Sequence, residues 1–308
     1  MEKAVQSEQN KTSLGGALLL IGVAAIWGTG IVSGKVGVSL LDPFAFTMVR
    51  NVLAGITLLA VAAVRDLVIS PRRGRPAAGS RRDLWKGGLL CGLFLFLGTW
   101  LQHTGLQTVE AGKGGFLMAL YMVMVPLIRV FMLKQKAPRT LIVCIPLALA
   151  ALWLLSITDG LTMGRGEFFS LLSAFGYTGH ILMADRYVGR ADVLKLSVIQ
   201  FFSGAVMAAA GAALAGGLPT LKHLPEVAVP MLYCGIVAGG IGFTLQLVGQ
   251  QYVQASLVGL LLSMEAVFSV LIGFIFLHER LSIREVLGCI LMFAAIVLSQ
   301  MPAGEPEE

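Results

Sequence analysis

The sequence predicts an all-α integral membrane protein with ten transmembrane helices arranged as two inverted five-helix repeats. Three observations support this prediction: the composition, the number of long apolar runs, and a repeat at a spacing of 144 residues. Hydrophobic residues make up 56% of the 308 residues and charged residues only 13%, whereas a soluble domain usually carries about 25% charged residues. A chain so poor in charge cannot cover the surface of an ordinary soluble domain.

Apolar runs long enough to cross a membrane recur along the whole chain. A run of about 18 or more apolar residues is a candidate transmembrane helix. Short connections separate most of the runs, and Pro43, Pro138 and Pro219 mark loop edges. The predicted spans are 14–34, 43–64, 84–106, 112–133, 140–158, 167–184, 195–216, 227–249, 255–277 and 283–300.

The spans divide the chain into two halves of equal size. We expect a first repeat over 14–158 and a second, inverted repeat over 159–300. A cytoplasmic leader, residues 1–13, precedes the first repeat, and an acidic cytoplasmic tail, residues 301–308, follows the second. The one substantial loop, 65–83, is basic and rich in Gly and Pro, and we expect it on the cytoplasmic side.

Lysine and arginine residues concentrate on one side of the predicted spans. With a cytoplasmic N-terminus, 15 of the 23 lie on cytoplasmic segments and 6 on the other side, while Arg50 and Arg129 lie within spans. Cytoplasmic loops of membrane proteins carry the excess of Lys and Arg, so both termini are predicted to be cytoplasmic. The net charge of +6 therefore orients the protein, and we expect no nucleic-acid partner.

A shift of 144 residues reveals an internal repeat. It aligns GTWLQHTGLQTVEAGKGGFL, residues 98–117, with GFTLQLVGQQYVQASLVGLL, residues 242–261. The shared polar pattern G-x-x-L-Q-x-x-G-x-Q-x-V-x-A is difficult to attribute to apolar composition alone. Because each half has an odd number of spans, the second copy is expected upside down in the bilayer. Inverted repeats are typical of secondary transporters that bind substrate near the midplane; duplication without transport is the alternative.

Four pieces of the sequence occur in the order and spacing of a known family. They are AIWGTGIVSGK at 25–35, DPFAFTMVR at 42–50, GLQTVEAGKGGFLMALYMVMVPLI at 105–128 and ASLVGLLLSMEAVFSVLIGFIFLHERLS at 255–282. With its ten spans, the chain resembles EamA-type members of the drug/metabolite transporter superfamily over nearly its whole length. The resemblance implies a secondary transporter of small organic solutes, often an exporter of metabolites or amino acids, in a prokaryotic inner membrane.

Glu265 lies near the middle of the apolar run LLSMEAVFSV, residues 261–270. A charge at that depth costs roughly 2.5–3.5 kcal/mol on insertion, so it is retained only where something offsets the cost. We expect Glu265 to face a wet cavity between the halves, where it can exchange a proton for a cationic substrate. Its equivalent in the first repeat is Tyr121. The alternative is a structural carboxylate that hydrogen-bonds another helix.

The other candidates are aromatic and polar side chains within the spans. Aromatic faces near a carboxylate suit an amine through cation–π contact, and histidine can relay protons. Each type can equally well pack or hydrogen-bond between helices. The candidates for substrate binding are Glu265, Tyr121, Trp27, Trp100, Gln102, His103, Tyr177 and Gln246. The candidates for coupling are Glu265, His103 and His180.

The leading hypothesis is alternating-access transport, as an exporter, of a small organic metabolite, amine or amino acid, with Glu265 as the coupling or binding carboxylate. One alternative is a carrier of anionic or zwitterionic solutes that uses Arg50, although such an arginine more often pairs with a buried acid or reaches the interface. Another is a non-transport membrane scaffold. An enzyme is not expected, since the spans contain no HExxH, no GxSxG and no paired aspartates.

We expect no cofactor and no metal. Cys91, Cys144, Cys234 and Cys289 are scattered through apolar runs, and no histidine in a span has a second ligand four residues away. The expected partners are a small-molecule substrate and the lipid bilayer, with protons and a second copy of the chain as candidates. Glu279, in LHERLS, is expected to cap the start of the tenth span.

Overall fold

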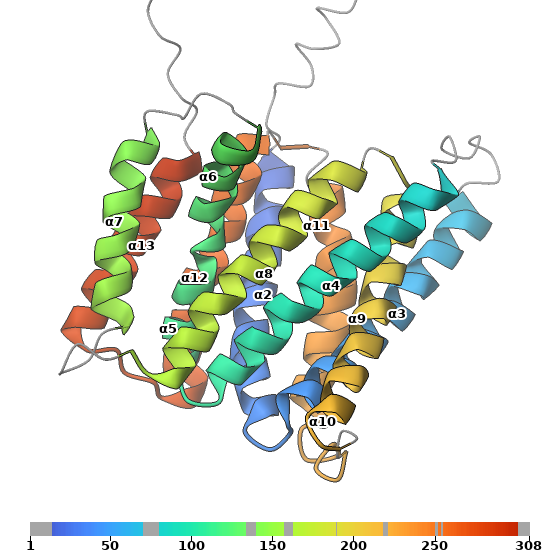
Figure 1. Cartoon of the computed structure of the whole chain (residues 1–308), viewed down its shortest axis with the longest axis horizontal. Coiled ribbons are helices and arrows are strands. Elements are labelled where there is room, and N and C mark those ends of the chain that lie inside the picture. Colours follow the sequence, from blue (N-terminus) through green and yellow to red (C-terminus); the bar gives the residue numbers. More distant parts are fainter. Residues whose placement is uncertain are drawn as a thin grey trace, which may run out of the picture.

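The computed structural model describes residues 14–69, 80–133, 140–156, 163–188, 190–217, 221–249, 252–253 and 255–300. Over these residues the chain folds into helices and contains no strand. The helices stand side by side in one bundle (Figure 1). The predicted leader 1–13, the predicted tail 301–308 and residues 70–79 of the basic loop lie outside the described residues.

The helices of the first half follow the predicted spans, except that the predicted span 112–133 is two helices with a turn between them at Leu120. They are α2 (Leu14–Val38), α3 (Pro43–Val64), α4 (Arg81–Leu106), α5 (Ala111–Ala119), α6 (Tyr121–Leu133) and α7 (Thr140–Ser156). Asp42 caps α3 by accepting from the backbone N–H of Phe44, and Pro43 supplies a fixed φ at the first helical position. A short π-helix, η1 (Arg65–Ile69), continues α3 into the region that the sequence predicts as a loop.

The second half departs from the expected pattern at its third helical segment. Its elements are α8 (Arg165–Val188), α9 (Val193–Leu214), α10 (Ala228–Leu232), the π-helix η2 (Tyr233–Gly242), α11 (Phe243–Gly249), α12 (Ala255–Leu277) and α13 (Ile283–Gln300). The predicted eighth span is therefore three segments with a π-helix in the middle. Glycines at 235, 239, 240 and 242 allow η2 to pack closely on α3 and α2, where side chains would collide.

The outer surface of the bundle is apolar. Among the residues that the structure describes, five helical segments are long and apolar enough to cross a membrane: Leu14–Val38, Pro43–Leu67, Arg81–Leu106, Val193–Leu214 and Ala228–Gln246. Leu214, Val229 and Phe131 are among many large apolar side chains that the bundle leaves exposed. A soluble protein rarely exposes so many large apolar side chains. The chain is a multi-pass membrane protein.

Helices of the two halves pack against each other throughout the bundle. The main pairs are α4 with α8, α3 with α9, α2 with α12, and α7 with α13. Figure 1 shows α7 and α13 at one edge of the bundle and α3 and α9 at the opposite edge. Each pair joins a helix from before residue 157 to one from after residue 163, so the two halves share a single interior. This interior contains the candidate site.

Candidate functional site

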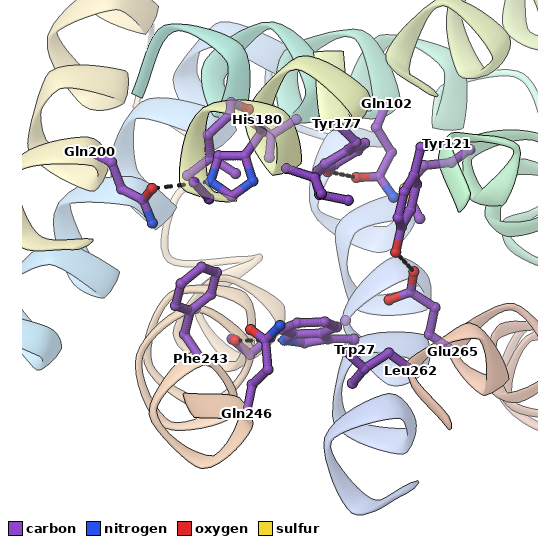
Figure 2. A pocket seen from close by; sticks show the side chains of 18 of the residues that line it. Trp27, Gln102, Tyr121, Tyr177, His180, Gln200, Phe243, Gln246, Leu262 and Glu265 are labelled. Carbon is purple, nitrogen blue, oxygen red and sulfur yellow. Dashed lines mark hydrogen bonds between the residues drawn. The ribbon is translucent and has the colours of Figure 1, made fainter. Parts of the chain in front are cut away.

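A cavity of about 560 Å³ lies in the interior that the two halves share. Pockets that hold small molecules usually measure about 300–1,000 Å³. Side chains from α2, α3, α4, α5, α6, α8, α9, η2, α11 and α12 line it, whereas α7 and α13 contribute none of its lining residues. Figure 2 shows this cavity with ten of its lining residues labelled.

Glu265 lies in the wall of the cavity, in the middle of α12. The residue is only 5% exposed, and Tyr121 Oη donates a hydrogen bond to its Oε1 at 3.0 Å (Figure 2). No cationic nitrogen of the described residues forms a salt bridge with it. A buried carboxylate with a phenol donor and no cation is able to bind a proton or a cationic group of a ligand.

Aromatic rings continue the wall beside Glu265. The rings of Tyr121 and Tyr177 are 5.8 Å apart, and Tyr177 Oη donates to Gln102 Oε1 at 2.6 Å. Trp27 Nε1 donates to the backbone oxygen of Ala238 at 3.0 Å. The polar atoms of these rings are therefore hydrogen-bonded, and all three rings belong to residues that line the cavity.

The two predicted histidines hydrogen-bond to neighbouring helices. His103 Nδ1 lies 2.7 Å from Thr47 Oγ1, and the ring of Phe46 meets the imidazole edge-on at 4.9 Å. His180 Nε2 lies 3.0 Å from Gln200 Oε1. Both imidazoles are buried and both line the cavity. Each histidine has a polar partner, and each is within reach of a bound ligand.

The structure brings nearly all of the predicted site residues to this one cavity. Those that line it are Trp27, Gln102, His103, Tyr121, Tyr177, His180, Gln246 and Glu265. Trp100 is not among the lining residues: it stacks on Phe44, with ring centroids 4.7 Å apart, and lies 6.1 Å from the ring of Phe96. Trp100 packs on an aromatic cluster beside the cavity, because it points away from the helix face that carries Gln102 and His103.

Several lining residues are absent from the predicted set. They include Thr99 on α4, and Ser197 and Gln200 on α9. Arg50 on α3, which the sequence offers only for the alternative carrier of anionic or zwitterionic solutes, also lines the cavity. Arg50 Nε is buried and has no hydrogen-bond partner among the described residues. Ser197 and Gln200 are three residues apart on a helix, so they share one face. Two polar residues at that spacing within an apolar run were the sequence signal for this part of the wall.

A buried ion cluster joins three helices at one end of the bundle. Lys113 Nζ, on α5, lies 2.8 Å from Glu167 Oε1 on α8 and 3.2 Å from Glu285 Oε1 on α13. Only 6% of the Lys113 side chain is exposed. The cavity extends toward the opposite end of the bundle, where Val193 begins α9 and lines it.

Glu279 strengthens the same end, in a different way from the one expected. Its carboxylate accepts from the backbone N–H groups of Ala111 at 2.8 Å and Gly112 at 3.4 Å, and Lys35 Nζ lies 3.8 Å away. The expectation that Glu279 caps the tenth span is therefore wrong, because it caps α5. The start of α13 is instead capped by Ser282 and Glu285, which exchange hydrogen bonds in a capping box.

Comparisons with known proteins find one matching family model and two similar transporters. A family model described as the EamA-like transporter family matches the chain twice, over residues 14–157 and 164–301. A protein of Archaeoglobus fulgidus named "Uncharacterized transporter" is 25% identical over 280 residues, which are 90% of this chain and 82% of that protein. "Uncharacterized transporter YoaV" of Bacillus subtilis is 22% identical over 285 residues, 91% of this chain and 94% of that protein.

A solved crystal structure shares the fold. It superimposes with a TM-score of 0.65 at 17% sequence identity and covers 96% of this chain and 100% of that chain. The two matches to the family model contain α2 to α7 and α8 to α13 in turn. The cavity therefore lies between the segments that the two matches cover.

Proposed function

The chain belongs to the EamA-like transporter family, and we propose that it is a secondary-active transporter that exports a small organic metabolite, amine or amino acid by alternating access. In this proposal the protein lies in a prokaryotic inner membrane with both termini cytoplasmic. The excess of Lys and Arg on the predicted cytoplasmic segments supports this orientation.

The observation that carries the proposal is the position of Glu265. The one carboxylate in the middle of α12 faces a cavity of suitable size, beside the rings of Tyr121 and Tyr177. An ammonium group at Glu265 would gain the carboxylate charge and contact with aromatic faces. A proton competes for the same carboxylate, so binding one and releasing the other provides a means of proton coupling.

The internal repeat supports ten spans in two inverted halves. Tyr121 and Glu265 are equivalent under the 144-residue shift, and they are hydrogen-bonded to each other. Equivalent positions of two repeats related by a two-fold axis meet only near that axis. An axis in the membrane plane would therefore pass close to this pair, so that Glu265 lies at the midplane, where inverted-repeat transporters bind substrate.

The two ends of the cavity differ in a way that suits alternating access. Lys113, Glu167 and Glu285 join three helices at one end, whereas the cavity extends to Val193 at the other. With the proposed topology, the ion-paired end is the outer one. Export would require the cluster to separate while the helices close around the inner end.

Arg50 supports a second candidate, a carrier of anionic or zwitterionic solutes. Its guanidinium lines the same cavity as Glu265, and its buried Nε lacks a partner among the described residues. An arginine can bind a carboxylate through two parallel hydrogen bonds. A solute bearing both an ammonium and a carboxylate group could use Glu265 and Arg50 together.

Ligand-induced thermal stabilisation tests the proposal. The purified wild type, Glu265→Gln and Trp100→Phe are heated with a panel of amines, amino acids, carboxylates and sugars at two pH values. A ligand at 100 times its Kd adds about 2.7 kcal/mol if it binds only the folded state. Amines should stabilise the wild type and Trp100→Phe, which alters a residue outside the cavity wall, and should not stabilise Glu265→Gln. If anions alone stabilise all three proteins, Glu265 is structural and the alternative carrier that uses Arg50 is favoured.

A further inference from the structure

A second polar site lies across the cavity from Glu265. It is formed by His180 on α8 and Gln200 on α9, and Figure 2 shows this pair on one side of the cavity and Glu265 with Tyr121 on the other. The amide oxygen of Gln200 can only accept a hydrogen bond, so His180 Nε2 donates to it. This leaves the amide nitrogen of Gln200, which is buried and has no partner among the described residues.

The unpaired nitrogen is in an unfavourable position unless a ligand or water reaches it. Gln200 is 1% exposed and His180 is 8% exposed. A buried donor without a partner costs about 1–3 kcal/mol, and folded proteins rarely retain one without water or a ligand. Gln200 lines the cavity, so its amide nitrogen is a candidate partner for a polar atom of the molecule that fills it.

Ser197 adds an acceptor to the same site. It lies one helical turn before Gln200, lines the cavity, and donates its own hydroxyl hydrogen to the backbone oxygen of Val193 at 2.8 Å. Its oxygen remains able to accept. The site therefore offers amide N–H donors from Gln200 and a hydroxyl acceptor from Ser197, and it carries no permanent charge.

An uncharged oxygen fits this set of groups. A hydroxyl accepts from Gln200 and can donate to Ser197, and a carbonyl accepts from Gln200 alone. A carboxylate that bound here would exchange its hydration water for neutral donors only. The free-energy cost of this desolvation is much greater for a carboxylate than for a hydroxyl. A methyl group would leave the amide nitrogen unpaired.

We infer that Gln200 and His180 form a specificity subsite, which selects amines that carry a hydroxyl or carbonyl oxygen at the end far from the ammonium group. The inference rests on the proposed function, because binding of the ammonium group at Glu265 is what places the far end of the substrate across the cavity. His180 acts as a positioning residue: its hydrogen bond holds the Gln200 oxygen, so that the nitrogen faces the ligand.

A matched pair of ligands tests the subsite. Hexylamine and 5-amino-1-pentanol are equal in length and differ at the far end, where one has a methyl group and the other a hydroxyl. Their Kd values are measured by calorimetry on the full-length protein in micelles, with protein-free micelles subtracted. Shorter and longer pairs of the same design cover other distances across the cavity.

The wild type should bind the hydroxylated amine of the best-fitting pair about 2- to 10-fold more tightly, the contribution of one neutral hydrogen bond. Gln200→Leu and Gln200→Met should abolish this preference, because neither ligand then meets an amide nitrogen that needs a partner. Glu265→Gln should weaken both ligands alike. The preference is a ratio measured within one variant, so a change in the folded fraction cancels.

Two results separate the failure of the subsite from the failure of the proposed function. If the amines bind through Glu265 but both members of every pair bind equally, or if the Gln200 variants retain the preference, the subsite is wrong and the proposed function stands. If no amine binds the wild type, the proposed function is wrong and the subsite fails with it.

Discussion

The backbone of Glu265 in α12 is in direct contact with Gly28 in α2. A Cβ atom built on Gly28 would lie 2.7 Å from the carbonyl oxygen of Glu265 and 2.9 Å from the backbone nitrogen of Ser269. The nearest atom of all is the Cβ of Phe268, at 2.5 Å. A side chain at this position of α2 would have to move α12, because two of the atoms it meets are backbone atoms and the third is a Cβ fixed to that backbone. The depth and orientation of the candidate binding carboxylate therefore depend on a glycine in another helix.

Gly28→Ala should disturb the site without removing any of its polar groups. We expect the added methyl group to displace α12 and to destabilise the protein by about 1–3 kcal/mol, the usual cost of overpacking. Ligands that contact Glu265 should also bind more weakly. Thermal unfolding of the purified protein, with and without an amine found to stabilise the wild type, measures both effects.

Gly22→Ala in the same helix is the control. A Cβ atom on Gly22 would meet nothing within 4 Å, and alanine favours a helix over glycine by roughly 1 kcal/mol. This variant should be as stable as the wild type or slightly more so, with unchanged ligand binding. If Gly28→Ala behaved like Gly22→Ala, the contact between α2 and α12 would not control the position of Glu265.

Lys113→Met tests the ion cluster that joins α5, α8 and α13. The substitution keeps most of the side-chain volume but leaves the carboxylates of Glu167 and Glu285 without their buried cation. We expect a loss of about 2–4 kcal/mol of stability, because removing one partner of a buried ion pair leaves an uncompensated charge. The melting temperature in micelles measures this loss.

The charge explanation has its own control. The triple variant Lys113→Met/Glu167→Gln/Glu285→Gln removes the carboxylate charges together with the cation, so it should recover most of the stability.

A second experiment tests whether the cluster also closes its end of the bundle. Cys234 lies in the cavity wall and is 3% exposed. If the cluster closes this end, a membrane-impermeant thiol reagent added on the side of the cluster should react with Cys234 faster in Lys113→Met than in the wild type. An unchanged rate of reaction would remove the cluster from the closing mechanism.

The sequence predicts the helices well because long apolar runs have few structural alternatives. It also predicts Glu265, because a single carboxylate in an apolar run is costly and needs a reason. The π-helix η2 was not predicted, since a glycine-rich apolar run reads as an ordinary helix. Its geometry depends on how closely Gly235 and Gly239 pack on α3, and that contact involves residues far apart in the chain.

The orientation of each helix in the bundle is the other feature that the sequence did not supply. Thr99, Gln102 and His103 share a face of α4 that lines the cavity, and Trp100 projects from a different face. A one-residue step along a helix turns the side chain by about 100°. Trp100 was included with its neighbours because a run of polar and aromatic residues does not indicate which face points inward. Gln200 was missed for the same reason.

Tyr121→Phe should isolate the contribution of the phenol to the site. The ring remains, but Glu265 Oε1 loses the donor that lies 3.0 Å away. We expect a loss of about 1–3 kcal/mol of stability, as for other buried polar groups left without a partner. Thermal unfolding measures the loss, and Glu265→Gln is the matched control, since its amide oxygen still accepts from Tyr121. Equal melting temperatures for Tyr121→Phe and the wild type would show that the hydrogen bond is replaced, for example by water.

Asp192 should make the stability of the protein depend on pH in the acidic range. Its carboxylate caps α9 through the backbone N–H of Lys195 and accepts two hydrogen bonds from Arg65 at 3.1 and 2.7 Å. Partial burial acts to raise the pKa of Asp192, but the hydrogen bonds from Arg65 and Lys195 outweigh it and hold the pKa below the ordinary value of 3.8.

A carboxylate whose pKa is lower in the folded state stabilises the protein at every pH above its unfolded pKa, and this stabilisation is lost as the pH falls through the folded pKa. We therefore expect the melting temperature of the wild type to fall below about pH 4, and the protonation of Asp192 should contribute to this fall.

Two variants of Asp192 test this expectation. Asp192→Asn retains a capping side chain but has no charge to titrate, so it should be less stable than the wild type at pH 7 and should lose less stability on acidification. Asp192→Ala also loses the cap and should cost about 1–2 kcal/mol at pH 7. Melting curves of the three proteins from pH 7 to pH 3 measure these differences, and parallel curves for the wild type and Asp192→Asn would contradict the assignment.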